Sequence, residues 1–173
     1  LAARLLVADN RIDRALGAFA RASELDPGDP AGFLGRGALL AGRGRFVEAE
    51  AVFDAGLAAN PGSIDLRYNL GLNRALRGDV DGAIEAFEAV LAADPGHTPA
   101  RENLAGALAA AGRYQESVVR FEEAIERSPS DPQLRLLAAR ACLAAGRRAQ
   151  AERHIEAAIR LDPAFASARR MLD

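Results

Sequence analysis

A proline recurs every 34 residues along this chain, five times and without an insertion. Each of these prolines follows a stretch in which apolar residues recur with helical spacing. Because proline cannot continue a helix, the pattern predicts the same helix end five times. The whole chain is therefore expected to be one supersecondary unit copied along its length. The five prolines are Pro27, Pro61, Pro95, Pro129 and Pro163.

Three other kinds of position repeat with the same period. Small residues predict points where two helices approach closely, and a bulky apolar residue beside them is expected to fill the remaining space. A turn residue divides each unit into two helices of similar length. The small residues are Ala3, Gly37, Gly71, Ala105 and Ala139, then Ala15, Ala49, Ala83, Ser117 and Ala151; the bulky ones are Phe19, Phe53, Phe87, Phe121 and Ile155; the turn residues are Asn10, Gly44, Gly78, Gly112 and Gly146.

Local signals also predict where the helices begin. Asp29, Thr98 and Asp131 each place a capping oxygen before a proline, and Ser63 is expected to cap another helix. The first helices of the units are predicted over 30–42, 64–77, 98–111 and 132–145, and the second helices over 46–59, 80–93, 114–127 and 148–160.

These landmarks resemble those of the tetratricopeptide repeat family, whose motif is a helix-turn-helix of this period. The stretches Tyr68-Asn69-Leu70-Gly71, Gly112-Arg113-Tyr114 and Ala83-Ile84-Glu85-Ala86-Phe87 look like bacterial members. The resemblance implies an all-α, right-handed α-solenoid of about five repeats, with the first helices lining the inner wall. It covers residues 1–173 as a single domain: a partial repeat 1–29, repeats 30–63, 64–97, 98–131 and 132–165, and a terminal helix 166–173.

The two ends depart from this pattern. Residue 1 is leucine and the first helix of the first repeat is short, so we expect a fragment or a processed product. The segment from Ala164 to Asp173 would begin a sixth repeat, as a cap or as a cut through a longer array. The sequence does not specify the cellular compartment of the protein. The cytoplasm is favoured, and the periplasm of a bacterium is the alternative.

Composition restricts the class of protein. Half of the residues are hydrophobic, the net charge is −2, and no apolar run approaches the roughly 20 residues that span a bilayer. We therefore expect no membrane insertion. All 22 basic residues are arginine, they alternate with carboxylates, and no aromatic residues are interleaved with them, which disfavours nucleic acid as a partner. The absence of lysine also disfavours the chaperone-tail clamp of some tetratricopeptide proteins.

The sequence offers no pattern for catalysis or metal binding. There is no nucleophile with a base, no pair of acids and no metal-ligand spacing, so no enzyme activity, cofactor or metal is predicted. His97 is expected in a loop between repeats and His154 on a second helix, far apart. Cys142 stands where other repeats have leucine and is interpreted as a buried core thiol.

The outward positions of the first helices are small and apolar with few polar groups, which suits a docked peptide or helix. Asn69 and Asn103 are 34 residues apart and resemble a two-rung version of the asparagine ladder of O-linked N-acetylglucosamine transferases. The alternative is that these asparagines cap or bridge neighbouring helices. The candidate binding residues are Leu34, Tyr68, Asn69, Leu72, Glu102, Asn103, Leu136 and Arg140.

The first and second helices of the repeats differ in charge. The first helices carry mostly arginine and the second helices mostly carboxylates, so an acidic partner segment is expected. Arg36 and Arg74 occupy positions that are leucine in other repeats, and either pair with second-helix carboxylates such as Glu50 or Glu85 or face a ligand. A column of arginines in register is either functional or ordinary for the family: Arg67, Arg101, Arg135 and Arg169.

The sequence thus predicts a non-catalytic scaffold or adaptor that binds a protein segment in the concave groove of a solenoid. Tyr68 and Leu72 would supply apolar contact, the asparagines backbone hydrogen bonds, and Arg140 charge pairing. Two alternatives stay open. One is a structural module that self-associates into homo-oligomers through its ends or by a terminal helix in another copy's groove. The other is an accessory domain of a larger enzyme.

Overall fold

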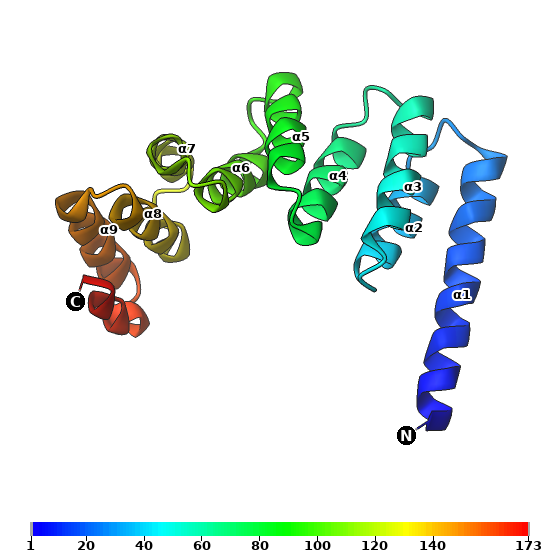
Figure 1. The fold of residues 1–173 in the computed structure, drawn as a ribbon, viewed down its shortest axis with the longest axis horizontal. Helices are drawn as coiled ribbons and strands as arrows, with labels where there is room; N and C mark the ends of the chain where they lie inside the picture. Colours follow the sequence, from blue (N-terminus) through cyan, green and yellow to red (C-terminus); the bar gives the residue numbers. More distant parts are fainter. Residues whose placement is uncertain (1, 173) are drawn as a thin grey trace. The chain divides into compact units, whose positions relative to one another are not determined.

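The computed structural model describes residues 2–172, and all regular structure in this range is helical (Figure 1). Contacts divide the chain into two compact units, Leu1–Ala89 and Val90–Asp173. The elements are α1 (Ala2–Leu25), α2 (Ala31–Ala41), α3 (Phe46–Ala59), α4 (Ile64–Arg77), α5 (Val80–Ala93), α6 (Thr98–Ala110), α7 (Tyr114–Arg127), α8 (Pro132–Ala144), α9 (Arg148–Leu161) and the 3₁₀ segment η1 (Pro163–Leu172).

The eight helices from α2 to α9 agree with the predicted ranges to within one residue at each end. The glycine predicted to separate each pair adopts the left-handed conformation, with φ between +73° and +88°. Only glycine adopts this conformation without a steric cost, which explains why the turn recurs at one position. The predicted all-α fold of paired helices is therefore confirmed. The four glycines are Gly44, Gly78, Gly112 and Gly146.

The first repeat differs from the prediction at Asn10. No turn forms there, and α1 continues without a break from Ala2 to Leu25 (Figure 1). The other repeats turn through a glycine with positive φ, whereas no non-glycine residue in the described range has positive φ. Asparagine bears a Cβ and pays a cost in that conformation, so the helix runs on. The part of α1 near Phe19 packs on α2.

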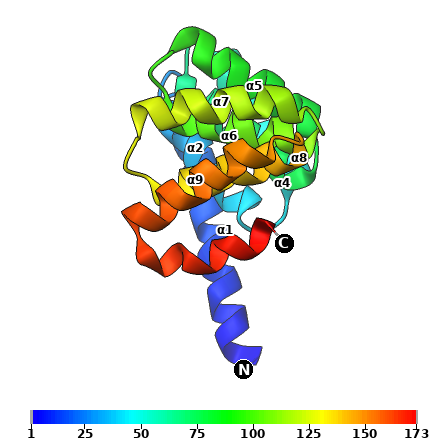
Figure 2. The same cartoon turned by 90° about the vertical axis from the view of Figure 1, so that its left-hand side faces the viewer.

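The C-terminal segment also differs from the prediction. The helix expected over 166–173 is a 3₁₀ segment that begins at Pro163, and Asp173 lies outside the described residues. Asp162 caps this segment, since its Oδ1 accepts from the backbone N–H of Ala164 at 2.9 Å. Tight 3₁₀ turns are frequent where a helical chain ends. Figure 2 shows the segment beside α9, on which it packs, and Ala168 is buried there.

In the first unit, the close-packing points lie where the sequence predicts them. A Cβ built on Gly37 would lie 2.3 Å from the ring of Phe53, and one on Gly71 would lie 2.8 Å from the ring of Phe87. The glycines therefore let each aromatic ring approach the neighbouring helix closely. One core cluster of this unit comprises Leu40, Ala49, Val52, Phe53, Leu66 and Leu70.

In the second unit, α6 packs on α7 and α8 packs on α9. Ser117 replaces the alanine of other repeats at one contact, and its hydroxyl donates to the carbonyl oxygen of Ala105 at 2.7 Å. Cys142 is fully buried, as predicted. The core cluster of the second unit comprises Ala105, Val118, Phe121, Ala124, Ile125, Leu134, Ala138, Ala139, Ala141, Cys142, Ala151, Ile155 and Ala168.

The helix caps are mostly those predicted. The Oδ1 of Asp131 accepts from the N–H groups of Gln133 and Leu134 at 2.8 and 3.1 Å, and Ser63 also caps its helix. The prediction for Thr98 is wrong, because His97 Nδ1 accepts from the N–H of Ala100 at 3.0 Å instead. An imidazole nitrogen is an acceptor that can replace a hydroxyl at this position.

Candidate functional site

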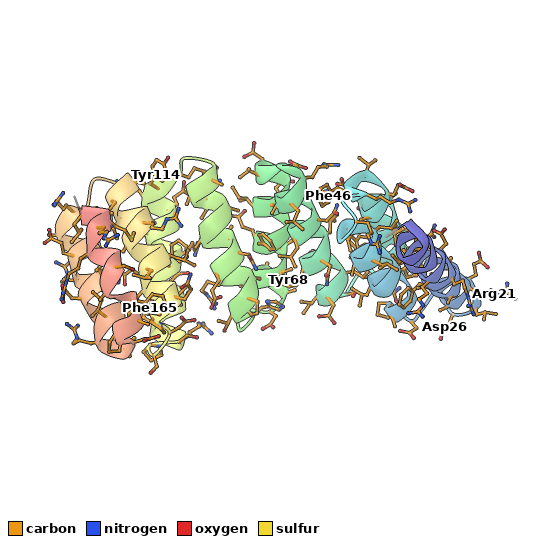
Figure 3. The ribbon with its side chains drawn as sticks, turned by 90° about the horizontal axis from the view of Figure 1, so that it is seen from below. Arg21, Asp26, Phe46, Tyr68, Tyr114 and Phe165 are labelled. Atoms are coloured by element: carbon orange, nitrogen blue, oxygen red, sulfur yellow. The ribbon has the colours of Figure 1, made fainter. Side chains whose placement is uncertain are left out.

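Leu34, Tyr68, Asn69 and Leu72 lie on α2 and α4, the first helices of the unit that ends at Ala89, and all are half-buried. Leu34 packs against the core cluster that contains Phe53. The ring of Tyr68, labelled in Figure 3, lies 5.9 Å from that of Phe87 at an angle of 52°. Leu34 and Tyr68 therefore give part of their surface to the core and leave part on the first-helix face.

The two asparagines hydrogen-bond within their own helices. Asn69 Nδ2 donates to the carbonyl oxygen of Asp65, and Asn103 Nδ2 donates to that of Pro99, both at 2.9 Å. Bonding of a side-chain amide to the backbone one turn earlier orients it along the helix surface. Neither bond caps or bridges a neighbouring helix, and a binding role for these residues stays a prediction.

Glu102, Asn103, Leu136 and Arg140 lie on α6 and α8, the first helices of the second unit. Leu136 packs against that unit's core cluster, whereas Arg140 is exposed. Burial, together with the nearby charge of Asp131, raises the pKa of Glu102 above its ordinary value. This face thus combines a partly desolvated carboxylate with a solvated guanidinium.

A pocket of about 350 Å³ lies on this face between α6 and α8, with α7 contributing part of its wall. Tyr114, labelled in Figure 3, is the first residue of α7 and lines the pocket together with Arg140. All the other lining groups are apolar or glycine. The lining residues are Gly106, Ala109, Ala110, Tyr114, Phe121, Leu137, Arg140, Ala141 and Ala144.

Gly106 keeps this pocket open. A Cβ built there would meet nothing within 4 Å, in contrast to the tight contacts at Gly37 and Gly71. A glycine in the middle of a helix costs about 1 kcal/mol relative to alanine. No packing contact in the second unit explains this cost. Gly106 differs from the packed glycines in that no aromatic ring lies opposite it.

The arginine column is explained by contacts within the chain. Arg67 Nη2 donates to the carbonyl oxygen of Pro61 at 2.7 Å, and Arg135 Nη2 to that of Pro129 at 2.8 Å. Arg101 donates to Pro95 in the same register. The guanidinium groups thus hold the turn that ends the preceding repeat. Arg169, which lies in η1, departs from this pattern and pairs with Glu156 of α9.

Arg74 pairs with a second-helix carboxylate, which is one of the two alternatives that the sequence left open. Its Nε donates to Glu50 Oε1 at 2.9 Å, and Arg77 pairs with the other oxygen of the same carboxylate. Glu50 belongs to α3, so one second-helix carboxylate pairs with two arginines of a first helix, and Arg77 pairs with Asp79 as well. These arginines are therefore not available to a partner segment.

Arg36 lies in a second cavity, of about 310 Å³, between α2 and α3. Its charge contributes to lowering the pKa of Glu48, although the hydrogen bond from Arg45 is the larger cause. A carboxylate thus already faces this arginine. The lining residues are Phe33, Arg36, Glu48, Ala51, Val52 and Ala55.

The histidines have structural contacts. His97 caps α6, as described above. His154 is buried, with Nε2 3.0 Å from Glu122 Oε1, which also accepts from Gln150 at 2.6 Å. Among residues 11–172, whose side chains the structure describes, no group of three histidine, cysteine or acidic side chains is arranged to hold a metal ion. None of the helices in that range has the length and apolar character needed to cross a membrane.

Comparison with solved structures shows the same fold in other proteins. The crystal structure of YrrB, a TPR protein with an unusual peptide-binding site, superposes with a TM-score of 0.80 at 24% identity, over 98% of this chain and 87% of that one. MamA from Desulfovibrio magneticus RS-1 matches with a TM-score of 0.81 at 19% identity, over 93% of this chain and 91% of that one. No curated protein matches the sequence.

Profiles of one protein family account for most of the chain. A tetratricopeptide repeat profile matches residues 1–64 and 68–132, and a second tetratricopeptide repeat profile matches residues 108–172. These matches agree with the repeat period, the helix pairs and the glycine-aromatic contacts described above. The chain belongs to the tetratricopeptide repeat family.

Proposed function

We propose that this chain is a non-catalytic protein-interaction module that binds a peptide or protein segment on the outward face of its first helices. The observation that carries the proposal is the apolar pocket between α6 and α8, with an exposed arginine at its edge. Ligand sites are concave, mostly apolar and furnished with a few polar groups. The peptide-binding site named for YrrB, which has the same fold, supports this assignment.

The first unit offers apolar surface on the equivalent helices. Leu76 of α4 is 67% exposed, although it lies in the last turn of an otherwise well-packed helix. Leu72 is half-buried one turn earlier. An exposed leucine next to a partly exposed one provides contact area for an apolar side chain of a partner.

Selection from a phage-displayed library of random peptides tests the proposal. Leu76→Glu should weaken binding of the selected peptides, because it places a charge on the first-helix face. Val47→Glu is the matched control, since Val47 is 70% exposed but lies on α3, a second helix. Arg140→Glu examines the second unit in the same way.

The outcomes separate the alternatives. Peptides that bind native protein and the Val47 variant but not the first-helix variants support the proposal. Failure to select any peptide, or equal binding to all variants, would overturn it. A mass that rises with protein concentration in the absence of peptide, and that Leu76→Glu abolishes, would instead favour the self-associating module.

A further inference from the structure

The pocket between α6 and α8 differs at two residues from the corresponding place in the first unit, between α2 and α4. Gly106 stands where that place has Ala38, and Arg140 stands where it has Leu72. The second unit therefore has an empty apolar space at Gly106 of α6 and a cation at the equivalent position of the next first helix, Arg140 of α8.

Arg140 differs from five other first-helix arginines in having no hydrogen-bond or ion-pair partner among the described residues. Arg67, Arg101 and Arg135 donate to proline carbonyls, and Arg74 and Arg77 pair with Glu50. Arg140 has no hydrogen bond or ion pair with any residue in the described range. Its guanidinium can therefore form a bidentate pair with an incoming carboxylate without breaking an internal contact.

The carboxylate of Glu102, on the same face, influences how a ligand is oriented in the pocket. Glu102 lies one helical turn before Gly106 on α6 and does not line the pocket. A ligand carboxylate is repelled by Glu102 and attracted by Arg140. The acidic group is thus expected at the α8 side of the pocket, with the apolar group inside it.

The carboxylate is expected to come from a side chain and not from a chain end. Terminal carboxylates are usually held by several backbone N–H groups of a turn. Gly106, Leu137 and Arg140 lie in helix interiors, where the backbone N–H groups are used within the helix. The nearby amide of Asn103 donates to its own helix. Arg140 is left as the charged donor of the pocket, and one guanidinium matches one side-chain carboxylate.

We propose that the pocket lined by Gly106, Tyr114, Leu137 and Arg140 recognises an internal partner segment in which a bulky apolar side chain enters the pocket and a neighbouring aspartate or glutamate pairs with Arg140. This inference rests on the proposed function and names the chemistry of its partner. Tyr114 is 38% exposed and provides an aromatic wall for the entering side chain.

The test compares peptides selected by three proteins from one library of internal 12-residue segments. Native protein should enrich an acidic residue next to leucine or an aromatic residue. Arg140→Glu should lose the acidic preference, and Gly106→Leu should lose the apolar one, because leucine would fill the pocket. The circular dichroism of each variant shows whether any loss reflects folding.

Affinities of one enriched peptide, acetylated and amidated, then measure the charge contact. Replacing its acidic residue by the amide should weaken binding about tenfold, and should have little effect on the Arg140→Gln variant. Arg127→Glu is the charge-matched control, since Arg127 is exposed on α7 and does not line the pocket.

The results separate this inference from the proposed function. If native protein selects peptides without an acidic preference, or if Arg140→Glu selects the same peptides, the inference is wrong while peptide binding stands. Enrichment only when the peptides are displayed with a free C-terminus would likewise overturn it, in favour of a terminal carboxylate. If no peptide is selected by any of the proteins, both proposals fail.

Discussion

The guanidinium of Arg67 donates a hydrogen bond of 2.7 Å to the carbonyl oxygen of Pro61, six residues earlier. Arg101 and Pro95 have the same relationship one repeat further along, and Arg135 and Pro129 have it two repeats further along. The recurring prolines and the recurring arginines therefore form one repeated contact, in which each of these arginines donates to the carbonyl oxygen of a proline. It satisfies a carbonyl oxygen of the turn between repeats, which the helices leave without a partner.

Replacing Arg67 by methionine should lower the free energy of unfolding by about 1 kcal/mol, because the stem remains while the donor is lost. Urea denaturation measures the change. Arg140→Met is the control, since Arg140 has no partner among the side chains of residues 11–172 and the change there should be close to zero. Equal effects of the two substitutions would show that the contact to Pro61 does not stabilise the fold.

Gly37→Ala should destabilise the chain by about 2 kcal/mol, because the added methyl group lies 2.3 Å from the buried ring of Phe53. Gly106→Ala is the matched substitution in another first helix. It should stabilise the chain by about 0.5–1 kcal/mol, because alanine favours the helix and the space is open. Thermal and urea unfolding of both variants should therefore shift in opposite directions, and shifts in the same direction would contradict the packing described here.

Glu50→Gln should cost about 2 kcal/mol, since it removes the charge that faces both Arg74 and Arg77. The glutamate side chain is only 15% exposed, so solvent replaces the lost contacts poorly. Glu85→Gln, at an exposed position of α5, should have a much smaller effect. Unfolding in urea at low and high salt measures both, and a comparable loss at the two sites would refute the bridging role of Glu50.

The stability contributed by Asp79 should depend on pH. The pKa of this carboxyl is lowered chiefly by the N–H of Gly82, which donates to Oδ1 at 3.1 Å, and further by Arg77. Because the pKa is lower in the folded than in the unfolded chain, the stabilisation is present above the ordinary value of 3.8 and is lost as the pH falls through the folded pKa.

Asp79→Ala should therefore cost about 1 kcal/mol at neutral pH, with the difference from native shrinking in acid. Asp79→Asn keeps an acceptor for Gly82 and should cost less, with little dependence on pH. Stability curves at a series of pH values check both variants. A cost for Asp79→Ala that stays constant into strong acid would contradict a role for the charge.

Glu102 should behave in the opposite way. Burial, and then Asp131, raises the pKa of this carboxyl, so the folded chain holds the proton more tightly than the unfolded chain. Stability is then lost as the pH rises from the ordinary value of 4.5 through the folded pKa. Glu102→Gln should stabilise the chain at neutral pH and have little effect below that range. A Glu88→Gln variant, at an exposed site on α5, should show no such gain.

The positions of the helices could be read from the sequence because their causes are local. The period of apolar residues defines each helix, the glycine with positive φ ends one, and proline ends the next. Asn10 shows the limit of this reading. Its place in the period predicts a turn, but without glycine the local preference for helix prevails and α1 is continuous.

The candidate site could be read only in part. The sequence identified the first-helix face and included Arg140, and it left open whether Arg74 pairs internally. It did not reveal that Arg67 holds the carbonyl of Pro61, because a side chain that folds back across a turn leaves no periodic signal of its own. The sequence therefore left open whether the column of arginines is functional or ordinary for the family.

The sequence by itself determined the repeat, the bounds of α2 to α9 and the packing of Gly37 and Gly71 against aromatic rings, since all of these follow from spacing along one chain. The tertiary structure decided which charges are already neutralised and where space remains. Glu50 reaches two arginines from a neighbouring helix, and Gly106 leaves a pocket that α6, α7 and α8 enclose together. Such contacts depend on distances between helices, which the order of residues within each helix does not specify.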